Sequence, residues 1–232
     1  MLKLIRLEMK KYKIGTYIRG VLIANLVMMG LPFIIFLTSK TTGENAFQSY
    51  NEIFLLINLL VKATFIVFAS VLLSRFVLDE YKYGTITLLF MYPIKRKKLF
   101  AAKLLIISGF TFLSIVMTNI FLIIVSCTIN SIYPLITEKL TEAVIFDNLL
   151  MIVTSALTSC CMALIPLFIG MKSKSVPSTI ISSIVIASIV CQTNSSGFSL
   201  SSIVAIPIVL SVIGVLIAYL SISNIEHIDV KL

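Results

Sequence analysis

Side chains that could do chemistry are few in this chain of 232 residues. The sequence has a single histidine, His227, and lacks the patterns that place two metal-binding histidines on a helix, expose a nucleophilic serine or cradle a phosphate. The cysteines lie within or at the ends of apolar runs, without the spacing of a zinc or redox site: Cys127, Cys160, Cys161 and Cys191. We therefore expect a protein that is not an enzyme and binds no metal or cofactor itself.

Lys62 is the residue best suited to meet a ligand, because it lies well inside an apolar run and has Asn58 one helical turn away. An unpaired lysine at the centre of a membrane helix costs about 2.5–3.5 kcal/mol on insertion scales. Three interpretations stay open: the amine reaches toward the outer interface, it loses its proton, or it faces a transport pathway and meets an anionic group of the substrate. In the last case, Asn58, Lys62 and Asn119 are the candidate pathway residues.

These residues sit in runs of membrane-spanning length, each near the ~20 residues that a helix needs to cross the hydrocarbon. Apolar residues make up 59% of the chain and charged residues 12%. Continuous apolar runs without alternation exclude a β-barrel. The sequence therefore predicts an all-α integral membrane protein with one permease domain, residues 1–232, and six transmembrane helices: Tyr17–Leu37, Ile53–Val77, Leu104–Ile129, Leu149–Met171, Val176–Cys191 and Ile203–Ser223.

Orientation follows from the lysines and arginines, which cytoplasmic loops retain. They gather before the first run, between the second and third, and after the fourth, whereas the opposite loops carry mostly glutamate and aspartate. Both termini are therefore predicted to be cytoplasmic. Anionic lipid head groups explain the net charge of +9, so lipids and not nucleic acid are the expected partners of these cations.

Residues 1–13 combine apolar residues at helical spacing with several cations. This pattern favours an amphipathic helix that lies in the cytoplasmic interface. The alternative is that the segment continues the first membrane helix inward.

Residues 78–100 are predicted to form a structured cytoplasmic loop. Gly84 can bend the backbone, Thr85 can cap a short apolar helix over Ile86–Met91, and Pro93 ends it before a basic cluster. The expected result is a short helix lying across the cytoplasmic face between the second and third membrane helices.

The succession Glu80, Gly84-Thr85, Pro93, Arg96 and Lys103 resembles the stretch after the second span in membrane subunits of type-2 ATP-binding-cassette (ABC-2) exporters. The resemblance implies that this loop contains a coupling helix that contacts a separate nucleotide-binding ATPase subunit, where ATP and Mg²⁺ bind, and that the assembly holds two copies of this ATPase subunit. It also implies pairing with a second copy of this chain or a homologous permease. The implied ATPase contacts are Asp79, Glu80, Tyr81, Lys82, Tyr83, Gly84 and Thr85.

Small residues in the fourth and fifth runs, such as Ser155, Ala156, Ser182 and Ser183, could serve this pairing, because they let helices approach closely. They could equally fill contacts within one chain.

The resemblance implies a subunit of a bacterial plasma membrane exporter that moves amphipathic peptides or hydrophobic drugs, as in peptide-toxin secretion, bacteriocin immunity or antimicrobial peptide resistance. The competing hypothesis is a gradient-driven transporter or channel, in which Lys62 gates or selects. A third is a membrane scaffold or sensor that works without a motor. Recruitment of an ATPase separates the first from the other two.

Overall fold

The computed structural model describes residues 8, 15–42, 49–79, 96–132, 142–173, 175–191 and 205–224. This described part consists of helices and their connections and contains no strand, so the prediction of an all-α membrane protein is confirmed. Four of its helical stretches are long and apolar enough to cross a membrane, and two shorter apolar helices accompany them. The interfacial helix expected over residues 1–13 (Glu8 apart), the Ile86–Met91 helix and residues Glu80–Thr85 lie outside the described residues.

The elements follow the apolar runs of the sequence. They are α2 (Gly15–Thr42), α3 (Tyr50–Leu73) with the π-helix η1 (Ser74–Leu78), α6 (Arg96–Ile132), α7 (Glu142–Met162), α8 (Ile165–Ser173), α9 (Val176–Val190) and α10 (Ala205–Asn224). The third run is the core of a longer helix, since α6 has 37 residues and starts within the basic cluster.

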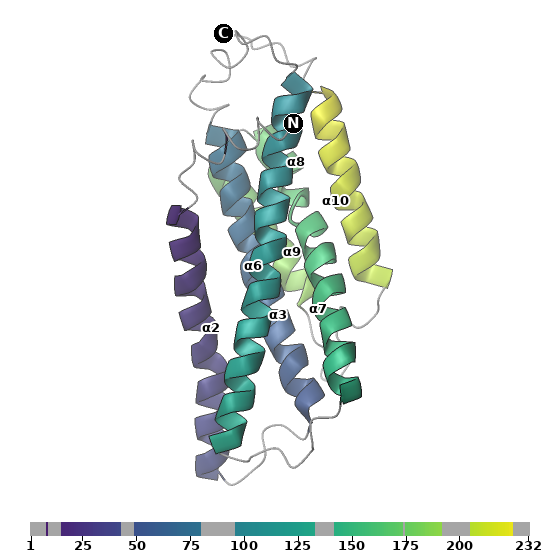
Figure 1. Cartoon of the computed structure of the whole chain (residues 1–232). Coiled ribbons are helices and arrows are strands. Elements are labelled where there is room, and N and C mark those ends of the chain that lie inside the picture. The colour runs from purple at the N-terminus through teal and green to yellow at the C-terminus, as the bar shows by residue number, and fades with distance from the viewer. Residues whose placement is uncertain are drawn as a thin grey trace.

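The helices form an elongated bundle with α3 in its middle (Figure 1). Helix α3 packs against α6, α7 and α9. Two hydrogen bonds fix the register of the antiparallel pair α3 and α6: Asn130 Nδ2 donates to the Tyr50 hydroxyl at 2.7 Å, and Lys103 Nζ donates to the Phe76 carbonyl at 3.2 Å. We call the two ends of the bundle the Tyr50 end and the Lys103 end.

The fourth predicted span, Leu149–Met171, is not one continuous helix. A turn at Ala163–Leu164 separates α7 from α8. Pro166 explains the break, because it has no N–H for the helical ladder and its ring clashes with the carbonyl four residues earlier. The local bonds change accordingly: Leu164 N–H donates to the Cys161 carbonyl at 3.2 Å.

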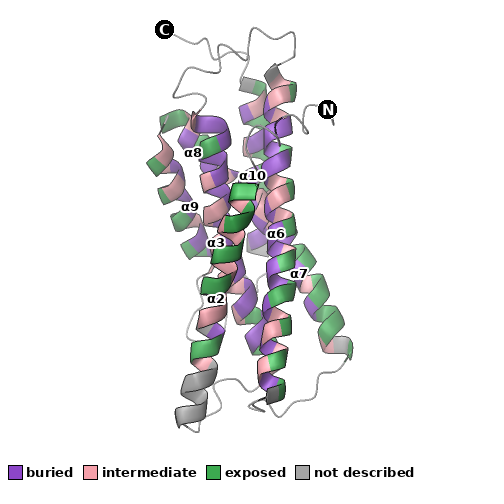
Figure 2. Cartoon of the chain, turned by 60° about the vertical axis from the view of Figure 1, so that its left-hand side comes forward, coloured by how far each residue is buried: buried purple, intermediate pink, exposed green. Residues whose placement is uncertain are grey.

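Helix α2 packs more loosely than the others, as its exposed outer face shows (Figure 2). Leu26 and Val27 are 69% and 70% exposed. Such apolar exposure along a helix of membrane-spanning length suits contact with lipid.

The small residues of α7 and α9 are used within the chain. Ser155, Ala156 and Ser183 are buried, and the Ser70 hydroxyl donates to the Ser183 hydroxyl at 2.8 Å across α3 and α9. The described residues thus support the intramolecular alternative for these positions.

Gly170 of α8 lies directly against Thr179 of α9 and Leu78 of η1. A Cβ atom there would meet Thr179 Oγ1 and would lie 2.8 Å from Leu78 Cδ1. Thr179 is fully buried and β-branched, so it has little freedom to move away. We expect Gly170→Ala to destabilise the protein by about 1–3 kcal/mol, measured as a lower unfolding temperature in detergent.

The double variant Gly170→Ala/Thr179→Ala is the control, because it removes the hydroxyl that the new methyl group would strike. It should recover part of the lost stability. An unfolding temperature equal to wild type in the single variant would show that α8 and α9 can separate at no cost.

Candidate functional site

Asn58 and Lys62 lie on one side of α3 in the interior of the bundle. Asn58 is 2% exposed and Lys62 is 7% exposed. At 1.5 Å per residue, Lys62 lies about 18 Å from Tyr50 along the helix and about 24 Å from Leu78. The structure therefore places both predicted pathway residues deep in the membrane-spanning part of the protein.

The amide of Asn58 has no hydrogen-bond partner on either Oδ1 or Nδ2. Asn119, the third predicted pathway residue, is 1% exposed; its Nδ2 donates to the Ile115 carbonyl at 3.0 Å, and its Oδ1 is unpartnered. A buried polar group without a partner costs about 1–3 kcal/mol. The unpartnered amide atoms of Asn58 and Asn119 therefore lower the stability of the fold, so fold stability does not explain why these residues are present.

Asn119 lies at nearly the same depth as Lys62. The two bonds between α3 and α6 place Asn119 level with Val61. Ile115 and Leu122, which flank Asn119 on its face of α6, pack in one apolar cluster with Ile57 and Val61. Asn58 and Lys62 directly follow Ile57 and Val61, so all three polar side chains border this cluster.

Helix α9 ends at this depth. The Cys191 thiol donates to the Leu59 carbonyl at 3.6 Å and lies close enough to Lys62 to interact electrostatically. Helix α10 also begins near this level, since Gly214 lies against the Cys161 carbonyl and Ala205 precedes it by about 14 Å of helix. Between Lys62 and the Tyr50 end, the described helices beside α3 are therefore α2, α6 and α7.

Further polar side chains at this depth were not singled out as a group from the sequence. The Thr118 hydroxyl donates to Asn25 Oδ1 at 2.8 Å, joining α6 to α2. Asn148 of α7 is 9% exposed. The contact between Thr111 and Cys160 sets the register of α6 and α7 and puts Asn148 within about a turn of Asn119. Asparagines inside apolar runs can be found in the sequence, but only the alignment of the helices in the structure shows that these asparagines lie at one depth.

A second region of interest surrounds Lys103, which is 2% exposed. Its bond to the Phe76 carbonyl joins the first turns of α6 to η1, and these two elements flank residues 80–95. Asp79, at the end of η1, is half-buried; the other implied ATPase contacts, Glu80–Thr85, are outside the described residues. π-Helical turns within α-helices often mark functional sites. The sequence motif included Lys103 but did not reveal its bond.

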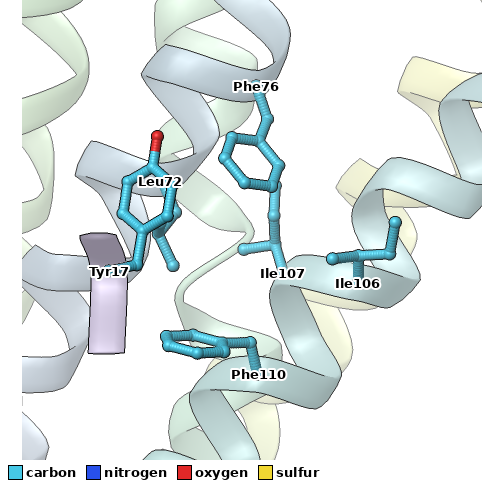
Figure 3. Close-up of a pocket in the computed structure, with 6 residues that line it drawn as sticks. All are labelled: Tyr17, Leu72, Phe76, Ile106, Ile107 and Phe110. Atoms are coloured by element: carbon cyan, nitrogen blue, oxygen red, sulfur yellow. The ribbon is translucent and has the colours of Figure 1, made fainter. Parts of the chain in front are cut away.

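An apolar pocket lies next to this region, between α2, the end of α3 with η1, and α6 (Figure 3). The rings of Tyr17 and Phe76 meet edge to face, with centroids 5.5 Å apart. Apart from the phenol hydroxyl of Tyr17, the side chains that line the pocket are apolar and can contact hydrocarbon: Tyr17, Leu72, Phe76, Ile106, Ile107 and Phe110.

In the described part of the chain, no group of three or more His, Cys, Asp or Glu residues could hold a metal ion. All four cysteines are free thiols, and Cys160 donates to the Ser108 carbonyl at 3.2 Å.

A bundle of apolar helices, four of whose described stretches are long enough to cross a membrane, defines the class of multi-pass membrane proteins. A family model described as "ABC-2 family transporter protein" matches residues 4–190, and the chain belongs to this family, which confirms the resemblance. A relative from Bacillus subtilis (strain 168), "Uncharacterized protein YcbO", is 43% identical over 228 residues, which are 98% of this chain and 100% of the relative. No solved structure matches the chain.

Proposed function

We propose that this chain is the permease subunit of an ABC exporter and that a separate ATPase subunit powers it. The observation that carries the proposal is the family match, which runs through residues 80–95. The sequence has no phosphate loop of its own, so ATP and Mg²⁺ would bind to the partner. The Lys103–Phe76 bond is compatible with this assignment, because it joins the two elements that flank residues 80–95.

The charges of the described helices support a cytoplasmic position for the Lys103 end. Cations gather there, whereas the acidic residues of α3 and α7 lie toward the Tyr50 end: the cations are Arg19, Arg75, Lys97, Lys98 and Lys172, and the acids are Glu52, Glu142 and Asp147. From the positive-inside rule we infer that residues 80–95 and both termini face the cytoplasm of a bacterial cell. Two copies of the permease, or this chain with a homologue, would sit above two ATPase subunits.

The cargo that fits best is an amphipathic peptide or a hydrophobic drug. The polar side chains around Lys62 could bind a polar group, and the apolar pocket beside Phe76 could contact an apolar one. Export of a toxin or bacteriocin, immunity and resistance to antimicrobial peptides all require cargo of this kind.

Charge reversal at Glu80 tests the coupling to an ATPase. We expect Glu80→Lys to abolish co-purification of the ATPase with the tagged chain in mild detergent, together with the ATPase activity of the eluate, because it reverses a charge at the implied contact. Membrane insertion and yield of the permease should stay unchanged.

Glu142→Lys is the matched control, since Glu142 is exposed at the Tyr50 end and should not face the ATPase. It should retain the partner. If wild type elutes without any ATPase in several detergents, the proposal fails and a gradient-driven transporter or channel becomes the better hypothesis.

A further inference from the structure

The buried polar groups around Lys62 have an unusual combination of hydrogen-bonding capacity. The ammonium of Lys62 and Nδ2 of Asn58 are donors, whereas Oδ1 of Asn58 and Oδ1 of Asn119 are acceptors. Three of these four groups have no partner. The same set of free donors and acceptors results if the amide of Asn58 is turned over, because neither its oxygen nor its nitrogen has a hydrogen-bond partner. The site therefore suits a ligand that both accepts and donates hydrogen bonds.

If Lys62 carries its proton, no acidic residue in the described part of the chain lies beside it to balance the charge. The described acidic residues of α3 and α7, Glu52, Glu142 and Asp147, are all exposed. The carbonyl end of α9 lies near Lys62 and offers about half a negative charge, which offsets only part of the ammonium charge. A full negative charge on a ligand would complete the compensation.

We infer that Asn58 and Lys62, with Asn119 beside them, bind the terminal carboxylate and the adjacent amide N–H of an amphipathic peptide. The carboxylate oxygens would accept from Lys62 and from Nδ2 of Asn58, and the peptide N–H would donate to a free Oδ1. An ionised alkyl phosphate supplies the charge but no donor, and a neutral drug supplies no charge. This inference rests on the proposed function and specifies its cargo.

The positions of α9 and α10 are compatible with peptide binding at Lys62. Helix α9 ends and α10 begins near the depth of Lys62, so a bound peptide would meet fewer described helices toward the Tyr50 end. The apolar cluster of Ile57, Val61 and Ile115 borders the polar groups and could contact the apolar part of the ligand.

Binding of matched probes to the full chain in nanodiscs tests the inference without any ATPase. The probes are N-dodecanoyl-dialanine, the same molecule with a C-terminal amide, and dodecyl phosphate, with empty nanodiscs as background. We expect the free acid to bind best and the capped amide to bind about 10- to 100-fold more weakly, because it lacks the charged hydrogen bond. Lys62→Met should weaken binding of the free-acid probe by a similar factor, and Asn58→Leu should also weaken its binding.

Stability measurements separate a binding role from a structural one. If Lys62 serves a ligand, Lys62→Met removes an uncompensated buried charge and should raise the unfolding temperature while it weakens binding. Lys172→Met, at an exposed lysine, should change neither. Unchanged binding in Lys62→Met, equal affinity for dodecyl phosphate, or no binding of the acid by wild type would each overturn the inference. Because no ATPase is present, these outcomes leave the Glu80 test of coupling unaffected.

Discussion

Inserting one methyl group at Gly214 is expected to be among the most damaging changes in the bundle. A Cβ atom at this position would strike the Cys161 carbonyl oxygen and would lie 2.8 Å from the Cys161 carbonyl carbon. The obstacle is backbone, so no rotation of a side chain can relieve the clash, and α7 and α10 must separate. We expect Gly214→Ala to cost about 3 kcal/mol or more, at the upper end of overpacking effects, and to exceed the cost of Gly170→Ala.

The same substitution at Gly109 is the matched control. Gly109 is exposed on α6, and nothing lies within 4 Å of a Cβ atom built there. Gly109→Ala should be neutral or slightly stabilising, because alanine favours helix over glycine. Unfolding can be followed with a thiol-reactive fluorophore, since the protein has four free cysteines and no tryptophan. Equal stability of the two variants would contradict the close approach of α7 and α10.

Replacing Lys103 with methionine is expected to have the second large effect. The substitution removes a buried ammonium that donates to the Phe76 carbonyl and leaves that carbonyl without this donor. Hydrogen bonds from charged groups contribute about 1.5–3 kcal/mol, so we expect a loss of that size. The unfolding temperature in detergent measures it.

Lys98→Met is the control for this variant, because Lys98 is exposed on the same helix five residues away. It should unfold like wild type. Lys103→Arg should retain part of the stability, since it keeps a donor but must fit a larger group in a buried space. If Lys103→Met were as stable as Lys98→Met, the bond to η1 would contribute nothing to the fold.

The sequence predicted the membrane class because that conclusion needs only composition and run length. The run Val176–Cys191 matches α9 almost residue for residue, as Pro177 favours the first turn of a helix. The break in Leu149–Met171 was missed, although Pro166 signals it, because the run stays apolar on both sides of the turn.

The candidate site was predictable in part. Lys62 and Asn58 stand out in one apolar run, so their pairing needed only helical periodicity. The shared depth of Asn119, Asn25 and Asn148 depends on how separate helices are aligned, and the bonds that align them join residues far apart in the chain. Lys103 belongs to the sequence motif, but its structural role became visible only with its bond to Phe76.

Helix α9 also has a consequence for the lipid around the protein. Its 15 residues measure about 22 Å, less than the ~30 Å of hydrocarbon in a typical bilayer. Acyl chains beside α9 must shorten or tilt to match it, whereas those beside the 37 residues of α6 need not. We therefore expect the bilayer to be strained where the described residues of α9 meet lipid, so that the chain length of the host lipids affects this face more than the face of α6.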